Sequence, residues 1–131
     1  MVPVEIRTMK LPSDCWDRSR ALDGVGGDEE LLSELAGIFC AAYPTLQNSL
    51  EESIAGKNYF RVADTAHLLG RAARNLAATK VMEAALAIEM MARRKEFDDI
   101  DNALYALRQE GGQLLDALAD FRNGRCGLSG V

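Results

Sequence analysis

The chain has 131 residues, of which 48% are hydrophobic, and its formal net charge is −5. This length suffices for one domain with a hydrophobic core and is too short for two. The acidic balance argues against a nucleic-acid partner, because binding phosphate backbones requires a basic face.

No apolar run of about eighteen residues occurs, so we expect no membrane-spanning segment. Charged residues interrupt the first fourteen positions, which is unlike a secretory signal peptide. The cysteines, Cys15, Cys40 and Cys126, are odd in number and form no CxxC pair, which favours reduced thiols and a cytoplasmic location. A single histidine without a second cluster of ligands predicts no metal site.

The N-terminal part of the chain is predicted to hold little regular structure. Residues 1–14 are polar and irregular and are interpreted as a flexible arm. A short amphipathic stretch over residues 16–22 predicts a lead-in helix. A glycine-rich segment, residues 24–27, should end it.

A long amphipathic helix is predicted from Asp28 to Ala55. Asp28 is a suitable N-cap, and two glutamates follow it in the first turn, where the helix dipole favours negative charge. Apolar residues then recur at three- and four-residue spacing. The stripe continues in phase beyond Pro44, so the proline should kink the helix without ending it. Gly56 is expected to stop it.

Three more helical patterns follow. Asn58 can cap a helix over residues 58–76, a third helix begins near Lys80, and a fourth begins at residue 98 or 99 and runs to about residue 122. Gly111-Gly112 should weaken or bend the fourth helix. Residues 123–131 are interpreted as a disordered tail.

Together these patterns predict an all-α fold. Residues 15–122 are expected to form an antiparallel up-and-down four-helix bundle, preceded by the short lead-in helix, because the connections between the helices are short. No segment shows the alternation typical of a β-strand.

The single histidine is expected to face solvent. Within the helix over residues 58–76, one face gathers the apolar positions Val62, Thr65, Leu69, Ala72, Ala73 and Leu76. His67 lies on the opposite side. Within about 60° of it lie Phe60, Ala63, Asp64, Gly70, Arg71 and Arg74. Because Ala63 and Gly70 are small, they should leave the imidazole open to a large partner.

This arrangement suits phosphoryl transfer. A neutral imidazole is a nucleophile, and phosphoryl transfer depends mainly on positioning and on neutralising charge. Arg71 and Arg74 would provide electrostatic support beside His67. Asp64 can hydrogen-bond the ring. The sequence has no phosphate-binding loop and no nucleotide fingerprint, so we expect no autokinase activity, and the phosphoryl group must come from a donor.

The segment from Ala66 to Ala78 resembles the signature AHxLKGxxxNLGA of the histidine phosphotransfer (HPt) domain family. Residues 22–35 are similar to the approach to that family's first bundle helix, and residues 39–44 to its Phe-to-Pro segment. The resemblance covers about residues 16–120. The ordered series of matches, more than any one block, makes it specific.

The resemblance implies a phosphorelay carrier. His67 would be the phosphoacceptor, and Phe60, Ala63, Asp64 and Gly70 would belong to a face that docks on the receiver domain of a hybrid sensor kinase or a response regulator. The receiver would supply Mg²⁺, so the chain itself would bind no cofactor. We expect a monomer.

The chain departs from the family pattern after the histidine, where Gly70-Arg71 replaces the usual Lys-Gly. The arginine could take over the role of the lysine, or it could cover His67 and leave a module that binds receivers and transfers poorly. Two alternatives to a carrier therefore stay open. One is a non-catalytic adaptor or inhibitor that binds a receiver or kinase with an HPt fold. The other is a self-assembling structural bundle, in which His67 would be buried.

Overall fold

The structure, a computed structural model, describes residues 16–130, and side chains are described up to Asn123. The predicted arm over residues 1–14 lies outside the described residues. Five helices make up nearly all of the described chain: α2 (Arg18–Gly24), α3 (Glu29–Ala55), α4 (Tyr59–Asn75), α5 (Thr79–Arg93) and α6 (Ile100–Gly130). The described residues include no β-strand, which confirms the predicted all-α class.

The predicted N-caps of α3 and α4 are confirmed. The Asp28 carboxylate accepts a hydrogen bond from the backbone N–H of Leu31 at 3.1 Å, and the Asn58 side chain accepts one from Arg61 at 3.1 Å. Each bond satisfies one of the backbone donors that a helix start leaves without an intrahelical partner. As predicted, α3 continues through Pro44.

The predicted end of α3 is confirmed, since the helix stops at Ala55 and Gly56 is its C-cap. The left-handed residue that closes the turn is not the glycine. Gly56 keeps a right-handed backbone with φ −85°, and the next residue, Lys57, has φ +55°. Its N–H donates to the carbonyl of Ile54 at 3.0 Å, which closes the helix end. Ala77 after α4 and Lys95 after α5 have φ values of +56° and +58°. All three turns therefore place a non-glycine residue in the left-handed region.

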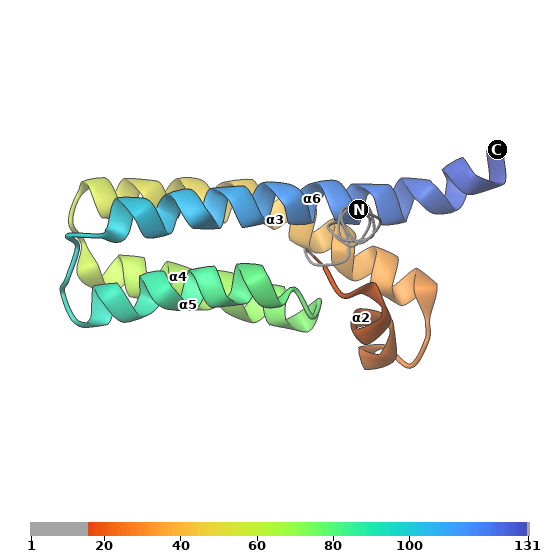
Figure 1. Cartoon of the computed structure of the whole chain (residues 1–131), viewed down its shortest axis with the longest axis horizontal. Helices are drawn as coiled ribbons and strands as arrows, with labels where there is room; N and C mark the ends of the chain where they lie inside the picture. Colours follow the sequence, from red (N-terminus) through yellow and green to blue (C-terminus); the bar gives the residue numbers. More distant parts are fainter. Residues whose placement is uncertain (1–15, 131) are drawn as a thin grey trace, which may run out of the picture.

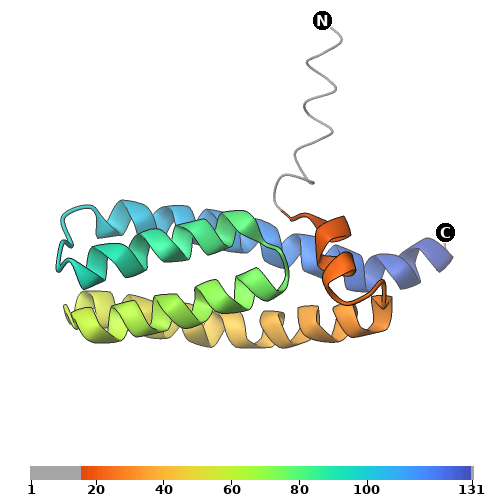
Figure 2. The same ribbon diagram turned by 90° about the horizontal axis from the view of Figure 1, so that it is seen from below.

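The four longer helices lie alongside one another. Figure 1 shows α3 beside α6, with α4 and α5 forming a second pair against them. Each of the four packs on two others, α4 on α3 and α5, and α6 on α3 and α5. One end of α3 and of α6 projects beyond α4 and α5, and α2 lies at that end (Figures 1 and 2).

The core runs between these helices and is formed mainly by aliphatic side chains, with a few buried aromatic ones. The largest fully buried ones come from every long helix: Leu32, Leu50, Val62, Leu69, Leu76, Val81, Ile88, Leu107, Leu114 and Leu118. Burying each stabilises the fold by about 1.5–3 kcal/mol before the loss of conformational entropy is counted. Trp16 extends the core toward α2, and its indole Nε1 donates to the carbonyl of Leu76 at 2.7 Å.

Two features of α6 differ from the prediction. The helix passes through Gly111-Gly112 without a break, and it continues beyond the predicted end near residue 122 to Gly130. Gly111 is buried, and the phenol of Tyr43 from α3 lies directly against it. A glycine here permits a close approach of two helices. No proline follows residue 122, so every residue of this segment can donate the backbone hydrogen bond that continues the helix.

None of the described helices combines the length and the apolar composition that crossing a membrane requires.

Candidate functional site

His67 lies at the middle of α4 and faces away from the core. Val62, Leu69 and Ala73 on the same helix are fully buried, whereas the side chain of His67 is 49% exposed. The expectation that the imidazole faces solvent is confirmed. It projects from the middle of a long, well-packed helix, so its position is fixed while its ring stays accessible.

The ring is held by a carboxylate from the neighbouring helix. Nδ1 of His67 lies 3.3 Å from each oxygen of Glu89 on α5. The Glu89 side chain is only 12% exposed, and its Oε2 also accepts hydrogen bonds from Arg93, at 2.9 Å from Nε and 2.6 Å from Nη2. Glu89 therefore links His67 on one side to Arg93 on the other.

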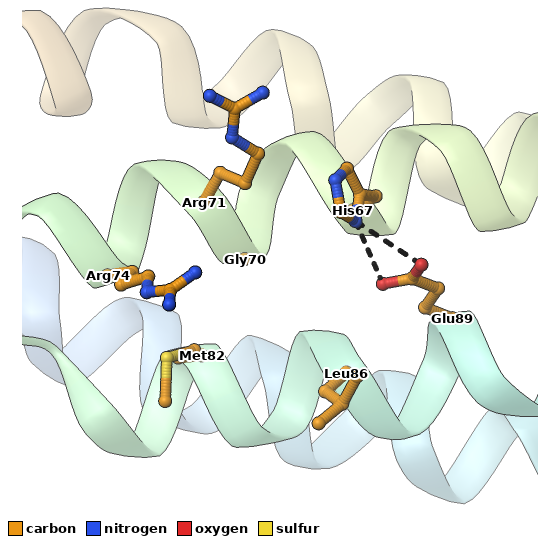
Figure 3. A pocket seen from close by; sticks show the side chains of 7 residues that line it. All are labelled: His67, Gly70, Arg71, Arg74, Met82, Leu86 and Glu89. Atoms are coloured by element: carbon orange, nitrogen blue, oxygen red, sulfur yellow. Dashed lines mark hydrogen bonds and ion pairs between the residues drawn. The ribbon is translucent and has the colours of Figure 1, made fainter.

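This contact distinguishes the two ring nitrogens. An ionised carboxylate can only accept hydrogen bonds, so in the neutral imidazole Nδ1 carries the hydrogen and donates it to Glu89. Nε2 then keeps its lone pair. In Figure 3, Nε2 lies on the far side of the ring from Glu89. The arrangement presents Nε2 as the nucleophilic atom.

A shallow apolar hollow of about 170 Å³ adjoins the ring between α4 and α5. Gly70 creates part of this space, because a Cβ added there would meet only the Cβ of Ala85, at 3.7 Å. Seven residues line the hollow: His67, Gly70, Arg71, Arg74, Met82, Leu86 and Glu89 (Figure 3). Its wall on α5 is apolar, and its rim on α4 carries two arginines.

The two arginines lie differently. In Figure 3 the Arg71 side chain points away from the His67 ring, whereas the Arg74 guanidinium leans toward the space between α4 and α5. Both side chains are exposed. The Arg71 side chain therefore does not lie across the imidazole. Of the two, Arg74 is better placed to meet an anionic group that enters the hollow.

The remaining predicted site residues divide into an exposed pair and one buried residue. Phe60 is 80% exposed and Asp64 is exposed, as expected from the helical wheel. Ala63 is only 4% exposed, so the expectation that it lies with His67 on the open face of the helix is wrong. The wheel assumed a single direction of burial, but α4 packs on both α3 and α5 and buries a wider arc.

Sequence analysis missed the contribution of α5, namely Glu89, Arg93 and the apolar wall of Met82 and Leu86. A signal was available. His67 lies ten residues before Ala77 in the α4–α5 turn, and Glu89 lies twelve residues after it. Two helices that pack back along each other from a short turn place such positions side by side.

Among residues 16–123, no three His, Cys, Asp or Glu side chains gather in a way that could hold a metal ion. The hollow is also small and shallow for an organic cofactor.

No protein-family model, curated protein or solved structure matches the chain.

Proposed function

We propose that the chain is a phosphorelay carrier of the histidine phosphotransfer kind, built as an antiparallel up-and-down four-helix bundle and working in the cytoplasm. His67 would accept a phosphoryl group from the aspartate of one receiver domain and pass it to another. The observation that carries the proposal is the exposed imidazole whose Nδ1 faces Glu89 and whose Nε2 lies on the opposite side of the ring from that carboxylate. A buried histidine would instead have favoured the structural bundle.

In the proposed reaction, the lone pair of Nε2 attacks the phosphorus of a receiver's phosphoaspartate. The N–P bond forms while the P–O bond breaks, and the electron pair leaves with the aspartate carboxylate. Nδ1 already holds its hydrogen, so His67 does not have to release a proton. Transfer to the next receiver is the reverse sequence.

Glu89 supports this step electrostatically. The imidazole becomes positively charged as the N–P bond forms, and the adjacent carboxylate stabilises that charge, mainly through the Nδ1–H. When the phosphoryl group leaves, the ring departs as neutral imidazole with Nδ1 still protonated. One carboxylate therefore supports transfer in both directions.

A receiver domain would dock on the surface formed by α4 and α5 around His67. Phe60 lies two turns before His67 on the same face, and α5 contributes Leu86 and Met90, which are also exposed. Exposed apolar side chains gathered around a reactive group are typical of a protein-binding surface. Arg74 adds positive charge beside the phosphoryl path, and the receiver would supply the Mg²⁺ that transfer requires.

The direction of Arg71 supports transfer over simple receiver binding, since its side chain leaves the ring open (Figure 3). The exchange of the family's Lys-Gly for Gly70-Arg71 therefore keeps the small residue beside the hollow without covering the phosphoacceptor.

The proposal is tested by incubating the chain with each receiver domain encoded in the same genome, after the receiver has been phosphorylated with acetyl phosphate. We expect an acid-labile, alkali-stable label on the wild type and none on His67→Gln, whose fold is checked by circular dichroism. Absence of label with every receiver contradicts the proposal. Receiver binding that is equally strong for both proteins, without label, would identify an adaptor.

A further inference from the structure

Arg93 belongs to the site through its contact with Glu89, although the exposure of its side chain would not suggest this. It lies at the end of α5, one turn after Glu89, and its side chain is 58% exposed. A glutamate and an arginine four residues apart on an exposed helix are common and contribute little to stability. This pair differs because the glutamate is largely buried and also contacts the imidazole.

The distances show which partner determines the position of the carboxylate. Arg93 contacts Oε2 through two nitrogens, at 2.6 and 2.9 Å, which is the range of charge-assisted hydrogen bonds. Both oxygens lie 3.3 Å from Nδ1 of His67, which is longer than that range. The stronger contacts are those with Arg93, so Arg93 holds the carboxylate in place and the imidazole adapts to it.

We infer that Arg93 is a positioning residue for the phosphoacceptor. By fixing Glu89 against Nδ1, it keeps the imidazole in the tautomer whose lone pair is on Nε2. Without Arg93, the flexible glutamate side chain can turn its carboxylate toward water, and the ring is then free to exchange tautomers. Arg93 would touch neither the phosphoryl group nor the receiver's aspartate.

The tautomer can be measured directly because the chain contains a single histidine. Long-range ¹H–¹⁵N correlation spectra of protein labelled with ¹⁵N-histidine report which ring nitrogen carries hydrogen, in the absence of any receiver. The variants are Arg93→Met, which keeps an apolar stem and removes the donors, and Arg93→Lys, which keeps the charge. Arg94→Met is the matched control, because Arg94 is exposed and adjacent and its loss changes the net charge equally.

We expect the wild type and Arg94→Met to show hydrogen on Nδ1 alone. Arg93→Met should show averaged nitrogen shifts that indicate both tautomers, and Arg93→Lys should restore most of the wild-type pattern. Unchanged shifts in Arg93→Met would overturn the inference. Hydrogen on both nitrogens in Arg93→Met would also overturn the inference. It would show that Arg93 weakens the electrostatic attraction between Glu89 and the ring and does not position the ring.

The consequence for transfer rests on the proposed function. Only one tautomer has its lone pair on Nε2. The rate of phosphoryl acceptance in Arg93→Met should therefore fall in proportion to the population of that tautomer, by about two- to fivefold. The two claims can fail separately. A tautomer change without transfer in the wild type rejects the carrier, whereas transfer in the wild type with unchanged shifts and rate in Arg93→Met rejects the role of Arg93.

Discussion

Adding one methyl group at Gly111 or at Gly112 should change stability in opposite directions. A Cβ at Gly111 would overlap the hydroxyl oxygen of Tyr43 and lie 3.0 Å from its Cε1 atom. A Cβ at Gly112 would meet nothing within 4 Å. Both positions lie inside α6, so the two substitutions have the same effect on backbone entropy and differ only in packing.

The magnitudes follow from that difference. Replacing glycine by alanine inside a helix stabilises it by about 1 kcal/mol, so Gly112→Ala should raise the free energy of unfolding by about that amount. At Gly111 the same gain is opposed by an overlap with a buried ring. Forcing additional volume into a packed core costs about 1–3 kcal/mol or more. Because the overlap involves several atoms of the ring, we expect Gly111→Ala to lower the free energy of unfolding by about 1–2 kcal/mol net.

Urea unfolding followed by far-ultraviolet circular dichroism measures both changes, and the fluorescence of Trp16, the single tryptophan, provides a second probe. Tyr43→Phe should recover part of the loss in Gly111→Ala, because it removes the nearest overlapping atom. That hydroxyl has no hydrogen-bond partner among the described residues, so its removal should cost little by itself. Equal stabilisation by both alanines would refute this account of the packing between α3 and α6.

Three other predictions concern Tyr43 and Gly70. Burial raises the pKa of Tyr43 to about 12 from 10.0, so between these values the folded protein keeps the phenol proton that the unfolded chain has lost. The contribution of Tyr43 to stability is therefore intact below pH 10. It is lost as the pH rises toward 12, which lowers the free energy of unfolding by about 2–3 kcal/mol. Alkaline unfolding of wild type and Tyr43→Phe should therefore diverge above pH 10, and parallel curves would contradict this. Gly70→Ala should raise the free energy of unfolding by about 1 kcal/mol, because the new Cβ meets Ala85 at an ordinary 3.7 Å. Gly70→Leu should keep the fold but fill the hollow and weaken receiver binding in a calorimetric titration, whereas unchanged affinity would show that the hollow is not part of the docking surface.

Much of the fold could be predicted because it depends on local sequence. Helical periodicity, the caps at Asp28 and Asn58 and the continuation of α3 through Pro44 each involve residues within a few turns of one another. The orientation of His67 followed from the same periodicity, since it depends only on which face of α4 is apolar.

What could not be predicted depends on contacts between helices. The burial of Ala63 follows from α4 having two neighbours, and the role of Gly111 follows from the approach of Tyr43. Glu89 reaches His67 only because α5 packs back along α4 in one particular register. A helical wheel describes one helix at a time. The spacing from the α4–α5 turn brings the two positions level along the helices, but it does not say which faces of α4 and α5 meet.

The left-handed turns are a different case. Gly56 ends α3 as predicted, but the positive φ, for which glycine is the usual residue, falls on Lys57. The backbone hydrogen bonds that close the turn outweigh the modest penalty of a side chain there.

The most direct test of the account is to identify the atom of His67 that carries the phosphoryl group. The chain is phosphorylated by a phosphorylated receiver domain, and the imidazole nitrogens are then assigned by ¹⁵N and ³¹P spectroscopy, which the single histidine makes unambiguous. We expect a bond from phosphorus to Nε2, with Nδ1 still directed at Glu89. A phosphoryl group on Nδ1, or on a residue other than His67, would contradict it.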